Sequence, residues 1–205
     1  MSDPLDPKRT SRDLKEVQEF LTQWLREKVT NPHITISDLR RPSGSGMSSE
    51  TLLFSANSKS ENSGLERQLV ARLAPTPEDI PVFQEYDLEF QVRTMKIVQE
   101  RTTIPVPNVL WLETDPTILG APFFVMEQVN GRVPPDLPPY VFGGWLLDAP
   151  PENQRSLESY SVEIISELAK IDLGALDTEF LEIGLPGETH LRRHFNAQKN
   201  YYQWV

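Results

Sequence analysis

The sequence predicts an α+β fold, in which an antiparallel sheet of five strands is accompanied by helices. Apolar residues recur at helical spacing in several segments, and short apolar runs bounded by turn-forming residues indicate strands in others. The predicted order is helix, three strands, helix, two strands. This order differs from the regular strand–helix alternation of a doubly wound sheet, and it favours helices on one side of an antiparallel sheet.

Residues Ser11–Val29 are predicted to form the first helix, because their apolar side chains recur at helical spacing. Asn31-Pro32 ends it, since a residue before proline disfavours the helical conformation. Three strands are then expected at His33–Leu39, Glu50–Ala56 and Arg67–Ala74. Between the second and third strands, residues 57–64 include no apolar side chain and are predicted to form a hairpin loop.

The second helix is predicted at Gln84–Glu100, and the last two strands at Val106–Glu113 and Phe123–Gln128. From Asn130 the composition changes, and the proline-rich residues 131–139 indicate a stiff linker. Two more helices are expected, at Ser156–Ile171 and from Thr189 to the last residue of the sequence. The predicted division is therefore an arm and helix at 1–29, a sheet lobe at 30–129, and a linker with the start of a helical lobe at 130–205.

Composition excludes several classes of function. The chain has 205 residues, no cysteine and a formal net charge of −10. Without cysteine it has no disulfide framework and no thiolate metal site. The acidic balance argues against nucleic acid as the main partner, since such binding depends on cations that face phosphates. No apolar run has the length of a membrane span and the N-terminus lacks the apolar core of a secretion signal, so a cytoplasmic location is expected.

Small residues are concentrated between the first two predicted strands, in the segment Ser43, Gly44, Ser45, Gly46, Met47 and Ser48. A turn of this composition lets backbone N–H groups approach phosphate oxygens without obstruction by side chains. A glycine- and serine-rich hairpin that binds nothing has the same composition, and this alternative stays open. The segment is not a P-loop, because no Gly-Lys-Ser/Thr follows it and the next element is a strand.

One cation, Arg72, lies among apolar neighbours on the third predicted strand. Kinases with this strand order place a cation there to hold the α- and β-phosphates, and pair it with a glutamate of the following helix. Glu89 lies on that helix. Two structural alternatives remain: Glu89 and Arg93 are spaced for a surface ion pair, and Arg72 also fits an edge-strand charge that discourages aggregation.

The most specific signal is the pairing of Ile104–Leu110 with Leu119–Arg132, together with the run Gly46–Phe54. These segments resemble the signatures of the aminoglycoside-phosphotransferase-like family, which also includes choline kinases and has a protein-kinase-like fold. The resemblance covers about residues 34–131, is fainter beyond, and is closest to the branch of phosphotransferase domains attached to some acyl-CoA dehydrogenases. It implies a two-lobed enzyme that uses ATP and Mg²⁺ to phosphorylate a hydroxyl of a small molecule.

The resemblance also implies roles for individual residues. The loop Ser43–Ser48 would cover the ATP phosphates, Arg72 would hold the α- and β-phosphates, and Glu89 would orient Arg72. The adenine site would comprise the backbone of Glu127 and Val129, with Val70, Ala71 and Met126 lining its pocket. The expected partners are a nucleotide and a small-molecule substrate of unknown identity.

The chain departs from the family pattern in two ways. Antibiotic kinases usually carry lysine at the position of Arg72, and arginine presents a wide planar fork instead of a point charge. The catalytic His-Gly-Asp segment and the Mg²⁺-binding Asp are expected beyond Val205, so we assign no catalytic residue and no metal ligand, and expect this chain alone to be inactive. His190 and His194 precede no such Asp and have no evident third ligand for a metal site.

Two other readings remain open. A kinase-like module that binds nucleotide, or that regulates without catalysis, would have the same N-terminal features. An unrelated α+β domain with chance similarity is the third reading. If the helical lobe is incomplete, its last two helices are expected to expose an apolar surface.

Overall fold

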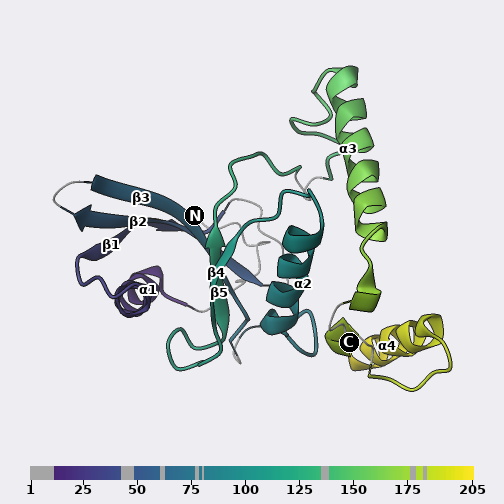
Figure 1. The fold of residues 1–205 in the computed structure, drawn as a ribbon, viewed down its shortest axis with the longest axis horizontal. Coiled ribbons are helices and arrows are strands. Elements are labelled where there is room, and N and C mark those ends of the chain that lie inside the picture. Colours follow the sequence, from purple (N-terminus) through teal and green to yellow (C-terminus); the bar gives the residue numbers. More distant parts are fainter. Residues whose placement is uncertain are drawn as a thin grey trace.

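The computed structural model describes residues 12–42, 49–60, 63–76, 79, 81–134, 139–175, 179–181 and 184–205. Five strands form one antiparallel sheet in the order β1-β2-β3-β5-β4 (Figure 1). The strands are β1 (Ile34–Arg40), β2 (Glu50–Ser60), β3 (Ser63–Leu73), β4 (Val109–Glu113) and β5 (Phe123–Glu127). The helices are α1 (Leu14–Lys28), α2 (Leu88–Arg101), α3 (Pro151–Ala169) and α4 (His190–Trp204), with 3-10 turns at Leu173–Ala175 and Glu179–Leu181.

Helix α1 begins at Asp13, whose carboxylate accepts hydrogen bonds from the N–H groups of Lys15 and Glu16. This cap satisfies N–H groups that have no partner within the helix. The apolar side of α1 is buried against one face of the sheet, where the rings of Trp24 and Phe123 lie 4.9 Å apart. The core on this face comprises Val17, Leu21, Trp24 and Leu25 of α1 with Leu52, Phe54, Leu69, Ala71, Leu73, Phe123 and Val125 of the sheet.

Helix α2 packs on the other face of the sheet, where Leu88 and Val92 contact Ala74, Ala121 and Phe124. Successive side chains of a strand point to opposite faces, so Phe124 faces α2 while its neighbours Phe123 and Val125 face α1. The expectation that the helices share one side of the sheet is therefore wrong. The order of elements along the chain does not determine the face on which each helix packs, and both faces of this sheet carry apolar side chains that need cover.

The hairpin between β2 and β3 is longer than predicted. The register continues without a break from Glu50↔Leu73 to Ser60↔Ser63, so most of the predicted loop 57–64 is paired strand. Backbone hydrogen bonds across the ladder hold this ribbon together, and they require no apolar side chains. A change from apolar to polar residues thus marks where the two strands leave the hydrophobic core, and not where their pairing ends.

Two predicted helix starts are also wrong. Helix α2 begins after Asp87, whose carboxylate caps the Phe90 N–H, whereas the preceding turn is held by the Tyr86 hydroxyl, which accepts from the N–H groups of Val82 and Phe83. Helix α3 begins at Pro151, since proline suits the first turn, where its missing N–H costs nothing. Strand β4 begins at Val109, three residues after the predicted Val106.

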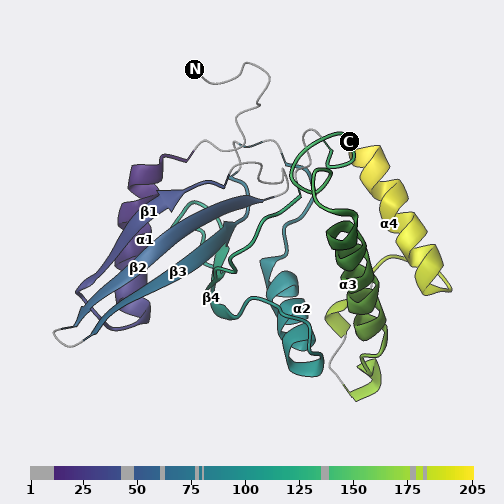
Figure 2. The same ribbon diagram turned by 90° about the horizontal axis from the view of Figure 1, so that it is seen from above.

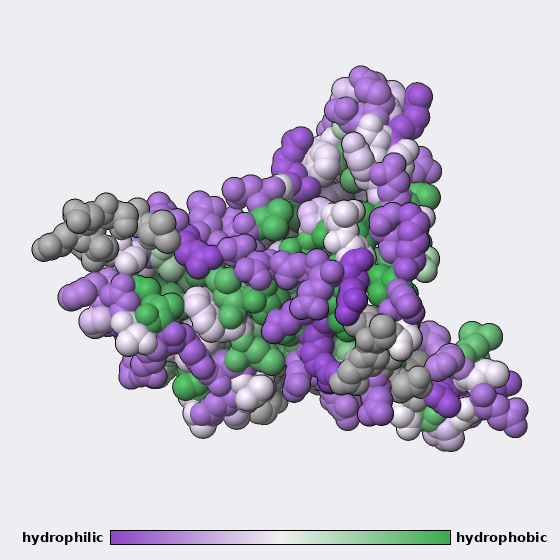
Figure 3. Space-filling view, viewed as in Figure 1, coloured by the Kyte–Doolittle hydropathy of each residue, from purple (hydrophilic) through white to green (hydrophobic). Residues whose placement is uncertain are grey.

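Helices α3 and α4 extend away from the sheet, and α2 lies between the sheet and α3 in both ribbon views (Figures 1 and 2). None of the residues of α3 or α4, all of which the structure describes, is buried. Their exposed apolar side chains include Ile165, Leu191 and Phe195, and apolar residues reach the surface along α3 in Figure 3. The expectation that these helices expose apolar side chains is confirmed.

Candidate functional site

Val70 and Arg72 lie on the face of β3 opposite to α1, because the alternate residues Leu69, Ala71 and Leu73 are buried in the α1 core. Val70 is 6% exposed and pairs in register with Met126 of β5. An apolar surface next to a cation is thus formed where β3 meets β5. The expectation that Ala71 lines the same surface is wrong, since its side chain is fully buried on the α1 side.

The Arg72 guanidinium is half-buried and only partly satisfied. Its Nη2 donates to the Ser49 hydroxyl at 2.5 Å. Its Nε is buried and has no hydrogen-bond acceptor among the described residues. Burial lowers the pKa of Arg72 from its ordinary value, because desolvation disfavours the charged form. A partly buried guanidinium with an unsatisfied N–H is costly to keep, so this group is suited to an anion that is brought from outside the chain.

The contact with Ser49 relates Arg72 to the predicted phosphate loop. Ser43, Gly44, Ser45, Gly46, Met47 and Ser48 lie outside the described residues. Ser49 follows them directly, and Thr51 pairs in register with Arg72. The guanidinium therefore lies at the start of β2, next to the residue that follows that segment, and it does not point into bulk solvent on the α1 side.

Glu89 is exposed in the first turn of α2. Within the described part of the chain, it forms no ion pair with Arg72 and none with Arg93. The guanidinium of Arg93 instead lies over the Phe180 ring, 4.0 Å from its centroid. The structure thus does not bring the predicted cation and carboxylate together.

The end of β5 presents backbone groups to the linker. The side chain of Glu127 is engaged elsewhere, since it accepts from Nη2 of Arg67 at 2.7 Å. The Glu127 N–H donates to the Asn108 carbonyl, and the Gln128 N–H donates to the Gln68 carbonyl. The Val129 N–H donates to no acceptor among the described residues, and this residue is 67% exposed. A free N–H three residues after Met126 is suited to the edge of a planar heterocycle.

Three charged residues that sequence reasoning missed surround the base of the predicted loop. Glu50 accepts from Nη1 of Arg12 at 2.7 Å and from Nε of Arg41 at 2.8 Å, one arginine on each carboxylate oxygen. The side chains of Arg12 and Glu50 are each 5% exposed. These partners are distant in sequence, and no periodic pattern marks them.

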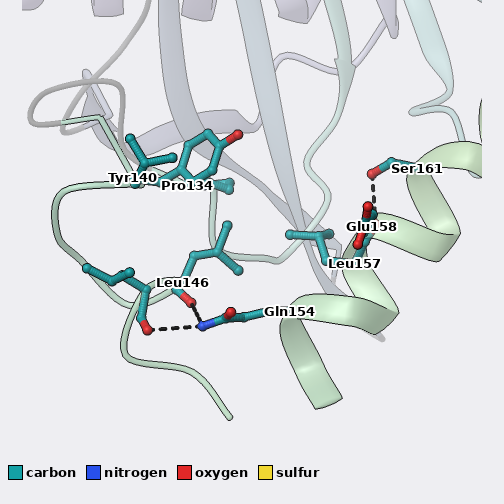
Figure 4. A pocket seen from close by; sticks show the side chains of 9 residues that line it. Pro134, Tyr140, Leu146, Gln154, Leu157, Glu158 and Ser161 are labelled. Carbon is teal, nitrogen blue, oxygen red and sulfur yellow. Dashed lines mark hydrogen bonds between the residues drawn. The ribbon is translucent and has the colours of Figure 1, made fainter. Parts of the chain in front are cut away.

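A pocket of about 640 Å³ lies beside the linker at the start of α3 (Figure 4). The amide of Gln154 donates to the carbonyls of Leu146, Leu147 and Ala149, which fixes the loop against the helix. The lining is mainly apolar, with Gln154, Glu158 and Ser161 as polar groups, and it includes Pro134, Tyr140, Val141, Leu146, Leu147 and Leu157.

The described residues contain no cluster of three or more His, Cys, Asp or Glu side chains arranged to hold a metal ion. Among the same residues, no helix has both the length and the apolar character needed to cross a membrane.

The model of the phosphotransferase enzyme family, APH, matches residues 41–202. The chain belongs to the phosphotransferase enzyme family. The match begins before the small-residue segment, continues through β5 and the linker, and ends within α4. Family membership thus supports a kinase-type transferase, as the motifs around Gly46–Phe54 and Leu119–Arg132 predicted.

Relatives of this phosphotransferase-family chain agree with the assignment. The chain is 30% identical over 138 residues to "Probable acyl-CoA dehydrogenase IBR3" of Arabidopsis thaliana, a match that covers 66% of the chain and 15% of that protein. This confirms the predicted relation to acyl-CoA dehydrogenase-associated phosphotransferase domains.

A solved structure supports the fold. The crystal structure of a protein assigned as an aminoglycoside phosphotransferase, from Ralstonia eutropha JMP134, superposes with a TM-score of 0.54 at 21% identity. The likeness covers 90% of this chain and 47% of that one, so the chain spans less than half of its solved neighbour. At this identity the likeness shows the fold alone: an α+β, kinase-like sheet lobe followed by helices.

Proposed function

We propose that the protein is an ATP-dependent phosphotransferase that acts on a hydroxyl of a small molecule, and that this chain supplies the nucleotide-binding lobe. The observation that carries the proposal is the Arg72 guanidinium, which is half-buried next to the end of the small-residue segment and has an unsatisfied Nε. A triphosphate supplies the anionic acceptors that such a group lacks.

The surroundings of Arg72 fit the rest of the nucleotide. Val70 and Met126 form an apolar surface against which an adenine ring would stack, and the free Val129 N–H lies at the linker side of that surface. The side chain of Glu127 is held by Arg67, so only the backbone of this residue would face the base. The segment Ser43–Ser48 would cover the phosphates.

Mg²⁺ would accompany the triphosphate and neutralise charge that develops on the transferred phosphoryl group. Arg72 would hold the α- and β-phosphates through charge-assisted hydrogen bonds and orient the nucleotide. Glu89 would take part only after α2 shifts or after its side chain turns toward Arg72, because it is exposed and unpaired with Arg72 as described above.

Calorimetric titration of the natural full-length protein with ATP–Mg²⁺ tests the proposal. Arg72→Ala is expected to weaken ATP affinity by about tenfold or more, the loss that follows removal of a charge-assisted contact. Lys15→Ala is the control, since it removes one exposed cation from α1, which covers the opposite face of the sheet. Equal affinities in the wild type and Arg72→Ala would remove the site assignment.

A non-catalytic, nucleotide-binding module is the alternative function, and the lack of an Arg72–Glu89 pair favours it. The two functions differ in whether the protein converts ATP and a hydroxyl compound into ADP and a phosphorylated product. Release of ADP that depends on an added hydroxyl compound supports the phosphotransferase, whereas ATP binding without any phosphorylated product across a panel of small alcohols, sugars and amino alcohols supports the module.

A further inference from the structure

We infer that Arg12, Glu50 and Arg41 act as positioning residues for the phosphate end of the nucleotide site. The inference rests on the proposed function. The three side chains form one network, named here the loop-base cluster, which joins the N-terminus of α1 to both sides of the segment 43–48.

The ion pair between Arg41 and Glu50 crosses the base of that segment. Arg41 precedes it by two residues and Glu50 is the second residue after it. Nε of Arg41 donates to Oε1 of Glu50 at 2.8 Å, and its Nη2 donates to the Arg12 carbonyl at 3.0 Å. Because both flanks are held together, the separation of the two ends is fixed by side chains as well as by strand pairing.

Arg12 ties this base to the rest of the lobe. Its Nη1 donates to Oε2 of Glu50, its Nη2 to the Ala74 carbonyl at 2.9 Å, and its Nε to the Leu119 carbonyl at 3.0 Å. One guanidinium thus joins the start of β2, the residue after β3, and the turn before β5. A planar fork with this many donors cannot be replaced by lysine without loss of contacts.

The cluster lies next to the cation that we propose binds phosphate. Ser49, the neighbour of Glu50, accepts the hydrogen bond from Nη2 of Arg72. Any displacement of Glu50 would therefore move the Ser49 hydroxyl and change the direction of the Arg72 guanidinium. Contacts thus lead from the two arginines to Glu50. From Glu50 they lead through its neighbour Ser49 to Arg72 at the proposed triphosphate site.

A purely structural role of the cluster predicts something different. Loss of the buried network would then lower the stability of the lobe and weaken all ligands of the site alike. A positioning role predicts a loss that is selective for ligands with phosphates, because adenosine would contact only the surface formed by Val70 and Met126 with the Val129 backbone. The ratio of ATP to adenosine affinity therefore separates the two roles.

The experiment uses the natural full-length protein and its variant Arg41→Gln, chosen because Arg41 is the least buried member, at 34% exposure of its side chain. ATP–Mg²⁺ and adenosine are titrated by calorimetry, and the melting temperature is recorded. We expect about tenfold weaker ATP binding with adenosine affinity unchanged. Arg40→Gln is the matched control, since Arg40 is exposed and donates to the Asp38 carbonyl.

A second variant excludes direct phosphate contact by Arg41. Glu50→Gln removes the charge that holds Arg41, so a positioning role predicts weaker ATP binding again, whereas a direct Arg41–phosphate contact predicts no loss. If Arg41→Gln fails to fold, Arg41→Lys replaces it, and an intermediate loss of ATP affinity is expected.

The possible outcomes distinguish failure of the proposed function from failure of the positioning role. Failure of the wild type to bind ATP defeats the proposed function. ATP binding by the wild type, with an ATP-to-adenosine ratio that Arg41→Gln and Glu50→Gln leave unchanged, overturns the positioning role and leaves the proposed function standing. A parallel loss of both ligands also overturns it.

Discussion

Trp24→Phe provides a strict test of how α1 is fixed to the sheet. The indole is 3% exposed, and its Nε1 donates to Oε2 of Glu113 at 2.8 Å. Its ring also packs edge-on against Trp111. Phenylalanine keeps a buried aromatic ring at this position but removes the N–H donor.

The magnitude follows from these contacts. A hydrogen bond to a charged acceptor contributes about 1.5–3 kcal/mol, and the smaller buried ring costs about 1 kcal/mol more. The variant should therefore lose about 3 kcal/mol of a stability that lies at roughly 5–15 kcal/mol for domains of this kind. It should remain folded, with a lower urea midpoint and an unchanged slope.

A double-mutant cycle with Glu113→Gln measures the interaction itself. Trp24 and Glu113 should show a coupling free energy of about 1 kcal/mol or more in urea titrations at pH 7. Lys28 also contacts the carboxylate, at 3.0 Å. Glu113→Gln should therefore still lower the free energy of unfolding when it is added to Trp24→Phe. Additive effects of the two substitutions would refute the role of this hydrogen bond.

The pH dependence of stability provides a second test of the hydrogen bond between Trp24 and Glu113. The hydrogen bond from Trp24, followed by the contacts with Lys28 and the Asp115 N–H, lowers the pKa of Glu113 from 4.5 to about 2. A carboxylate with a lowered pKa contributes stability that is fully present above pH 4.5 and is lost as the pH falls toward about 2. The stability difference between wild type and Glu113→Gln should therefore shrink across that window, and a constant difference would contradict the assignment.

Two further predictions concern single backbone features. Asp13→Ala should cost about 1 kcal/mol by removing the cap of α1, whereas Asp13→Asn should cost little, and a thermal melt that does not distinguish the two would contradict the capping role. Gly120→Ala should cost about 1 kcal/mol because its φ is +77°, a conformation strained for alanine. Gly131→Ala, where an added Cβ meets nothing within 4 Å, is the control and should be close to neutral in the same melt.

The sequence predicted most elements of the fold because each has a local signal. The apolar spacing and Asp13 cap of α1, and the apolar run of β5, are properties of contiguous residues. The predictions that failed depend on partners elsewhere in the chain. The polar residues 57–60 are strand because they pair with residues 63–66, and α2 covers the face opposite to α1 because Phe124 and Val125 point in opposite directions.

In the candidate site too, a residue with a local signal was predicted and residues that depend on distant partners were not. Arg72 was predicted from its apolar neighbours and its place in the order of elements, and the structure places it beside Ser49. Arg12, Glu50 and Arg41 were missed because their contacts span as many as 107 residues, from Arg12 to Leu119. Glu89 was chosen for its place on the helix after β3, but helix position does not determine whether a flexible exposed side chain meets a particular partner.

The contacts of the C-terminal helices with the sheet lobe converge on α2 and the turn before it. The Tyr201 hydroxyl donates to the Val82 carbonyl at 2.9 Å, and the Phe180 ring packs against Phe90. A hinge motion at the linker would consequently pull on the helix that carries Glu89 while the strands stayed in place. Such a motion would change the distance between Arg72 and Glu89, the carboxylate that the proposed function assigns to orient it.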